Sequence, residues 1–179
     1  MQVFQGSPKD LNGRNENEIA IYKLLDELGI EFSRVDHEPV CSMEECQIVN
    51  ELLKPAKHCK NLFLCPVNKS QYYMLVMEES KKFASGKISR QVNSSRLQFG
   101  NDEDLYKYLG VRPGSVGVLA LLHDTENKVQ LLVDEDLLAT EYITVHPGVN
   151  TSSVALKTND LFTKYLQGVN HSYITVKCQ

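Results

Sequence analysis

Three short polar stretches carry side chains that could take part in chemistry. Lys60 and Asn61 stand directly before the apolar run "LFLCPV". The stretch "RPGS" holds Gly114 and Ser115, and His146 follows "YITV". A lysine can stabilise a developing negative charge, a Pro-Gly turn exposes backbone N–H and C=O groups, and an imidazole with a pKa near 6.5 can handle protons. Each feature also has an ordinary explanation: a surface lysine, a tight turn or a hydrogen-bonded histidine.

Standard catalytic signatures are absent from the sequence. It contains no G-x-S-x-G, no P-loop, no G-x-G-x-x-G after a strand and no H-E-x-x-H. The five cysteines form no C-x-x-C pair, which argues against a disulfide framework and a zinc ribbon, so free thiols and no metal or cofactor are expected. A further histidine, His37, precedes a proline in "HEPV". Polar groups at strand ends and in Gly/Pro loops therefore remain as the candidate site.

Length and composition indicate one globular domain. The chain has 179 residues, of which 42% are hydrophobic and 23% charged, as in ordinary soluble domains. The net charge of -4 argues against a broad nucleic-acid surface, although "LLKPAKHCK" and "ESKKFASGKISRQ" allow a local basic site. The apolar runs are too short to span a bilayer and the N-terminus lacks a signal-peptide h-region, so a cytoplasmic protein without a membrane contact is expected.

Hydrophobic spacing and capping residues predict the elements that would position these side chains. Helices are expected over 16–28 and 43–53, after Asn101, and from Thr158 or Asn159. Strands are expected at "EFSRVD", "NLFLCPV", "QYYMLVMEE", "VQLLVD", "YITVHP", "SSVALKT" and "SYITVK", while "HDTENK" turns the apolar run "VGVLALL" back into "VQLLVD". Residues 80–100 read as irregular or briefly helical. We therefore predict a polar lead-in over 1–15, followed by a mixed α+β domain over 16–179. This domain is expected to contain six to eight strands, largely connected by hairpins.

The order of four pieces along the chain resembles a known family. "HEPVCSMEE", "HCKNLFL", "LGVRPGSVGVLALL" and "VHPGVNTSSVAL" together resemble the YbaK/prolyl-tRNA-synthetase-associated family of aminoacyl-tRNA editing domains, over about residues 16–177. The pair Lys60-Asn61 before "LFL" is most similar to the free-standing branch that deacylates alanyl-tRNA(Pro). The resemblance implies a mixed, largely antiparallel sheet of six to eight strands, or a partly closed barrel, flanked by helices. It also implies a hydrolase that removes the wrong amino acid from proline tRNA.

The resemblance assigns roles to the candidate residues. The family's motif lysine corresponds to Lys60, which is expected to lie in the cleft against the aminoacyl-adenosine end, with Asn61 beside it. The backbone of Gly114 is expected to help place the attacking water, with Ser115 next to it. His146 would orient that water or act as base. Lys60 would stabilise charge or hold the terminal phosphate or ribose, and the sequence leaves both roles open.

Two positions depart from the family pattern. Val118 stands where the loop usually ends in proline, and Cys59 where related sequences often carry a small hydroxyl residue. The pocket for the amino acid side chain is expected to be lined by Pro39, Val40 and Met43. A pocket just large enough for a methyl group would exclude the proline ring, so that correctly charged tRNA survives.

The resemblance also predicts partners. These are aminoacyl-tRNA, held at its CCA end and acceptor stem, and prolyl-tRNA synthetase; no DNA is expected. The lysines expected to contact tRNA are Lys54, Lys57, Lys81, Lys82 and Lys87. The alternatives are a deacylase for cysteinyl- or seryl-tRNA, a non-catalytic module that binds aminoacyl-tRNA or an amino acid, and a structural partner of a synthetase.

Overall fold

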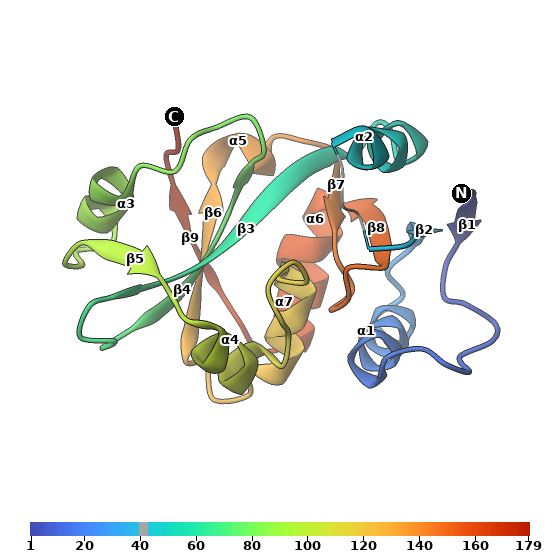
Figure 1. Ribbon diagram of the computed structural model, residues 1–179, viewed down its shortest axis with the longest axis horizontal. Coiled ribbons are helices and arrows are strands. Elements are labelled where there is room, and N and C mark those ends of the chain that lie inside the picture. Colours follow the sequence, from blue (N-terminus) through green and yellow to red (C-terminus); the bar gives the residue numbers. More distant parts are fainter. Residues whose placement is uncertain (40–42) are drawn as a thin grey trace.

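The computed structural model describes residues 1–39 and 43–179, and the side chains of all of these except 43–45. Figure 1 shows a twisted sheet with helices packed on it. The helices are α1 (Glu16–Glu27), α2 (Met43–Leu52), α3 (Ser85–Gln91), α4 (Asp102–Leu109), the 3-10 helix η1 (Val118–His123), α5 (Glu135–Leu138), α6 (Thr158–Asp160), the π-helix η2 (Leu161–Tyr165) and α7 (Leu166–Gly168). The strands are β1 (Val3–Gln5), β2 (Phe32–Asp36), β3 (Lys57–Pro66), β4 (Tyr72–Glu78), β5 (Leu97–Phe99), β6 (Val129–Asp134), β7 (Tyr142–Val145), β8 (Ser152–Lys157) and β9 (Tyr173–Val176).

The sheet is open and mixed. Its strand order is β1-β2-β8-β7-β3-β4-β6-β9, with β5 also paired to β3. The long strand β3 joins the two halves: Lys57 and His58 pair in parallel with β7, and the stretch from Cys59 to Leu64 pairs antiparallel with β4. The predicted α+β class is confirmed, but the described residues form nine strands rather than six to eight, and the sheet does not close into a barrel.

The differences from the predicted elements lie in short or fully buried segments. Strand β1 lies within the predicted polar lead-in and β5 within the stretch predicted to be irregular, and each has three residues, too few for alternation to be recognised. The apolar run "VGVLALL", for which no element was predicted, contributes the 3-10 helix η1. Its residues from Val118 to Leu121 are completely buried, and a run that is apolar on every side does not reveal its period.

The predicted helix ends are confirmed where capping residues mark them. The Asn15 side chain accepts a hydrogen bond from the Asn17 backbone N–H at 2.9 Å at the start of α1. Asn101 does the same for Asp104 at 2.7 Å at the start of α4. Gly110, with φ +64°, ends α4 in the left-handed conformation that glycine adopts without strain. None of the helices in the described part of the chain is long and apolar enough to cross a membrane.

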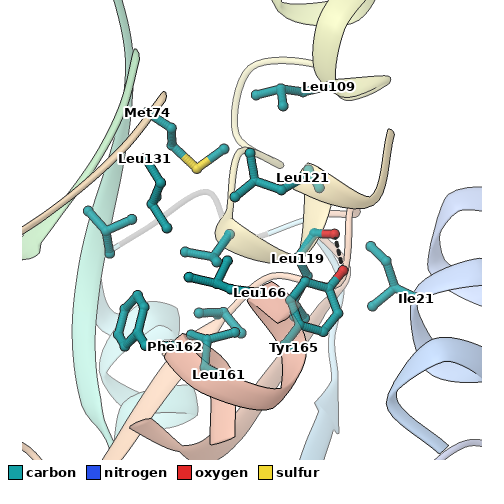
Figure 2. Close-up of a cluster of buried hydrophobic side chains, with 14 of the residues drawn as sticks. Ile21, Met74, Leu109, Leu119, Leu121, Leu131, Leu161, Phe162, Tyr165 and Leu166 are labelled. Carbon is teal, nitrogen blue, oxygen red and sulfur yellow. Dashed lines mark hydrogen bonds between the residues drawn. The ribbon is translucent and has the colours of Figure 1, made fainter. Parts of the chain in front are cut away.

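The main core fixes the loop that precedes η1. Side chains of η2, α7, the sheet and η1 interlock in this core (Figure 2). The Tyr165 hydroxyl donates a 2.5 Å hydrogen bond to the Leu119 carbonyl (Figure 2), and burial raises the pKa of Tyr165, so the hydroxyl remains a donor. Because η1 is anchored in this way, the "RPGSVG" turn before it is held against the end of β7.

Candidate active site

A cavity of about 260 Å³ lies where β3 passes from β7 to β4. Helix α2, strands β3, β7 and β8, the residue after β4, the loop between β7 and β8 and the turn at Gly114 supply its wall. The described wall residues are Cys46, Val49, Asn50, His58, Cys59, Asn61, Glu79, Gly114, Thr144, Val145, His146, Asn150 and Ser153. Three of the five predicted catalytic residues, Asn61, Gly114 and His146, therefore meet at one cavity, although they lie far apart in the sequence.

Unpaired polar atoms are concentrated in this wall. Within the described part of the chain, five buried side-chain nitrogen or oxygen atoms have no hydrogen-bond partner. Three of the five belong to wall residues: Nε2 of His58, Oδ1 of Asn61 and Oγ1 of Thr144. An unpaired buried polar group costs about 1–3 kcal/mol, so most such groups in folded proteins are paired. Their convergence on one cavity indicates a site for a polar ligand.

His146 carries the proton acceptor of the site. Its Nδ1 lies 3.0 Å from the Ser152 carbonyl oxygen. A carbonyl can only accept, so Nδ1 carries the hydrogen and Nε2 of the neutral ring keeps its lone pair. Burial lowers the pKa of His146, against the opposing effect of the Ser152 carbonyl, and the nearby His37 lowers it further. The ring is therefore neutral at physiological pH and can act as a base.

Cys59 is a wall residue that does not act as a nucleophile. Its thiol donates a hydrogen bond to the Thr144 carbonyl at 3.3 Å. Burial raises the pKa of Cys59 to about 12, although the Asn61 side chain opposes the shift. The reactive form of cysteine is the thiolate, which is scarce at such a pKa.

The described residues contain no group of three or more His, Cys, Asp or Glu side chains arranged to hold a metal ion.

The "RPGSVG" turn packs tightly against His146. The Ser115 backbone N–H donates to the Arg112 carbonyl at 3.0 Å, and Gly114 has φ +86°, a conformation that suits glycine at the third position of such a turn. A Cβ at Gly117 would lie 3.2 Å from the His146 carbonyl oxygen. Gly114 lines the cavity, whereas Ser115 is buried on the other side of the turn and lines a neighbouring groove.

Lys60 does not lie with the other candidates, which differs from the cleft position expected from the resemblance. Its neighbours Cys59 and Asn61 both line the cavity, and successive side chains of a strand point to opposite faces. The Lys60 amine donates to the Glu79 carbonyl at 3.1 Å and to the Lys81 carbonyl. The strand alternation therefore turns this amine away from the cavity and towards the backbone that follows β4.

The expected side-chain pocket falls only partly within the described residues. Val40 and the side chain of Met43 lie outside them. Pro39 is exposed and is not among the described residues that line the cavity. The apolar surface in the described wall comes instead from Val49 of α2 and Val145 of β7.

A larger groove of about 680 Å³ adjoins the cavity. Asn150 lines both hollows, and Gly114 and Ser115 stand on either side of the boundary. Tyr106 lines the groove with 58% of its surface exposed, and the Arg112 guanidinium lies 5.4 Å from the centre of its ring. The two hollows thus form a narrow chamber that opens into a wider polar groove.

The lysines expected to contact tRNA lie outside this groove. Lys81 is largely buried, with its amine 2.7 Å from Asp134 and 2.5 Å from Asp136. Lys54 contacts Glu51 at 2.7 Å, and Lys57 contacts Glu78 at 3.7 Å. Lys87 contacts Gln179. Among the described lining residues of the groove, the cations are Arg14 and Arg112.

Several site residues were missed by the sequence analysis, and two of them had a usable signal. Thr144 of β7 precedes His146, the residue that follows this strand, by two residues, and Cys59 precedes Asn61 by two on β3. Residues at this spacing share a strand face, so each could have been predicted from its partner. Glu79 follows a strand and Arg14 lies in the polar lead-in, where no pattern marks a site.

Comparisons with known proteins agree with the expected family. Residues 37–164 match the model of the aminoacyl-tRNA editing domain. The chain is 30% identical over 142 residues to "Prolyl-tRNA editing protein ProX" of Acetoanaerobium sticklandii. This match covers 79% of this chain and 86% of that protein. It is 27% identical over 157 residues to "Prolyl-tRNA synthetase associated domain-containing protein 1" of Danio rerio, covering 84% and 81%.

Solved structures share the fold. The one described as "Crystal structure of a putative trans-editing enzyme for prolyl tRNA synthetase" superposes with a TM-score of 0.66 at 17% identity, and the match covers 91% of this chain and 98% of that one. At this identity the likeness concerns the fold, and it supports the same arrangement of sheet and helices.

Proposed function

This chain belongs to the aminoacyl-tRNA editing domain family, and we propose that it hydrolyses the aminoacyl ester of mischarged tRNA in trans, with alanyl-tRNA(Pro) as its substrate. The observation that carries the proposal is the cavity in which unpaired polar atoms of His58, Asn61 and Thr144 surround a small space beside the neutral ring of His146. Such a chamber suits a small polar group held for attack by water.

The lining of the cavity supports an amino acid with a small apolar side chain. Val49 and Val145 supply apolar wall for a methyl side chain, while the unpaired polar atoms suit the carbonyl and amino groups that every aminoacyl ester carries. A synthetase site shaped for proline rejects a smaller amino acid by only about 1–3 kcal/mol per missing methylene, whereas a second, smaller site excludes the proline ring by overlap. The cavity is proposed to act as that second site.

The hydrolysis needs no covalent intermediate. Nε2 of His146 takes a proton from a water molecule while the water oxygen attacks the carbonyl carbon of the ester. In this scheme the Asn61 amide and the Gly114 backbone N–H, from two residues that line the cavity, stabilise the negative charge that develops on the carbonyl oxygen. The proton then passes to the departing ribose oxygen, which leaves a free amino acid and tRNA with a free terminal hydroxyl.

The adjoining groove is proposed to hold the 3′ end of the tRNA. The exposed ring of Tyr106 with the guanidinium of Arg112 beside it offers a surface on which a base can stack, and stacking of this kind contributes about 1–3 kcal/mol per base. Since Asn150 and the turn at Gly114 border both hollows, an adenosine in the groove would present its ester to the cavity.

A panel of charged proline tRNAs tests the proposal. Alanyl-, seryl-, cysteinyl- and prolyl-tRNA(Pro) are incubated with the protein, and the remaining ester is measured over time. We expect the alanyl ester to be lost at least about tenfold faster than the others and the prolyl ester to survive, as expected for exclusion by size. Faster loss of the seryl or cysteinyl ester would change the assigned substrate, and tight binding without any ester loss would replace the enzyme with a binding module.

A further inference from the structure

The cavity wall has a distinctive charge. Among its described residues, Glu79 carries the one carboxylate, and there is no lysine or arginine. Glu79 follows the last residue of β4 and is exposed, so its carboxylate stands where the cavity meets solvent. The described part of the wall is therefore negative at its rim and otherwise neutral, which favours a ligand that carries a positive charge.

Glu79 acts on the inner wall of the cavity. Burial lowers the pKa of His58, and the negative charge of Glu79 opposes this shift. Burial also raises the pKa of Cys59, and here the charge of Glu79 adds to the shift. The Asn61 side chain also acts on the Cys59 thiol, and its Oδ1 is buried without a hydrogen-bond partner among the described residues. The Glu79 carboxylate and the Asn61 amide thus both act on the same thiol.

The backbone of Glu79 is held from two sides. Its N–H donates to the His58 carbonyl at 3.3 Å, and its carbonyl accepts from the Lys60 amine at 3.1 Å. Lys60 also binds the carbonyl of Lys81. The lysine that points away from the cavity therefore fixes the segment that carries the carboxylate at the rim.

We infer that Glu79, with Oδ1 of Asn61, binds the α-ammonium group of the aminoacyl ester, and that Lys60 is a positioning residue for Glu79. An ammonium group offers three N–H donors and one positive charge, which matches a carboxylate and an unpaired amide oxygen. The inference rests on the proposed function, because it names how that substrate is recognised. It makes the site selective for esters with a free amino group.

The test compares two substrates that differ at one group. Alanyl-tRNA(Pro) carries an α-ammonium group, and lactyl-tRNA(Pro) carries a neutral hydroxyl in the same place. We expect Glu79→Gln to lower kcat/KM for the alanyl ester about tenfold, the lower end of what a hydrogen bond to a charged group contributes, and to leave the lactyl ester unchanged. Glu78→Gln is the matched control, because Glu78 pairs with Lys57 at 3.7 Å and does not line the cavity; it should change neither rate.

Two outcomes would overturn the inference. Glu79→Gln could lower both rates equally, which would make Glu79 structural, or it could lower neither, which would remove it from recognition. Lys60→Met is expected to lower the alanyl rate about threefold to tenfold and to add little when combined with Glu79→Gln, because residues that act through each other are not additive. A loss on the lactyl ester would instead give Lys60 a role that does not pass through Glu79.

Binding measurements keep this test separate from the test of the proposed function. Adenosine derivatives that carry alanine or lactate through a stable 3′-amide can be titrated calorimetrically, and binding needs no turnover. Tighter binding of the alanyl derivative that is lost in Glu79→Gln supports the inference even if the wild-type protein cleaves no ester, and equal binding of the two derivatives overturns it even if the ester is cleaved.

Discussion

Two groups of buried polar side chains meet at Ser152 and differ in how their atoms are paired. On one side, the Ser152 hydroxyl donates to Asp36 at 3.1 Å, and Asp36 in turn binds Arg14 at 2.7 Å and Arg34. On the other side, the Ser152 carbonyl accepts from His146 at 3.0 Å at the edge of the cavity. The first group is a closed network of charges, and the second contains the unpaired atoms of the cavity wall.

The charged network satisfies its members even though it is buried. Glu18 and Arg34 expose 3% and 4% of their surfaces, which only paired charges tolerate. Arg14 bridges Glu18 at 2.6 Å and Asp36. The network fixes the residues before α1 to β2 and β8 and thereby supports the carbonyl that orients His146. The paired groups of the network have a structural role, whereas the unpaired atoms gathered in the cavity wall suit a ligand that completes them.

The largest expected effect concerns His146. His146→Gln removes the proposed base, so kcat/KM for alanyl-tRNA(Pro) should fall by about 10² to 10⁴, while the melting temperature stays within a few degrees of wild type. His123→Gln is the matched control, because burial also lowers the pKa of His123 and this side chain does not line the cavity. Equal activity of the two variants would place the base elsewhere.

The pH dependence of the wild-type reaction checks the same assignment. The pKa of His146 is lowered, so the neutral, active ring predominates above a pKa that lies below the usual value of about 6.5. We expect kcat/KM to rise with pH through that pKa and to level off before neutrality. An inflection above about pH 7 would contradict the role of His146 as base.

The next effect concerns stability on the paired side. Burial alone would raise the pKa of Asp36, but hydrogen bonds from Arg14 and Arg34 lower it. Asp36→Asn leaves the buried guanidinium of Arg34 without its partner charge. We expect the free energy of unfolding to fall by about 2–3 kcal/mol, less than for a fully buried pair, because the Asp36 side chain is 31% exposed. Chemical denaturation measures this free energy.

The sign of the pH dependence follows from the lowered pKa. Asp36 contributes stability above its unfolded pKa of about 3.9, and this contribution is lost as pH falls through the lower folded value. The difference between wild type and Asp36→Asn should therefore be constant near neutrality and shrink below about pH 4. A difference that persists unchanged to about pH 2 would show that the charge of Asp36 does not matter.

The two regions also differ in how far the sequence predicts them. His146, Asn61 and Gly114, which line one cavity, were predicted as site residues because polar residues at strand ends and in Pro-Gly turns stand out against apolar runs. The direction in which the Lys60 side chain points was not predicted. The resemblance supplies a role for this residue, whereas the pairing of β3 with β4 and β7 sets the face of the strand on which it lies. The sequence did not predict the charged network, because Arg14 and Asp36 lie in stretches without a recognisable motif and only tertiary packing brings them together.

The smallest expected effect distinguishes the two regions by its sign. Thr144→Val replaces an unpaired buried hydroxyl of the cavity with a methyl group of similar shape, so stability should stay unchanged or rise by up to about 1 kcal/mol while deacylation slows. Thr140→Val is the counterpart, because that hydroxyl donates to the Leu137 carbonyl at 2.8 Å and contacts Thr158 at 3.1 Å; it should cost about 1 kcal/mol and leave the reaction unaffected. If Thr144→Val destabilised the protein as much as Thr140→Val, the Thr144 hydroxyl would be a structural group, and the argument that unpaired wall atoms await a ligand would fail at that position.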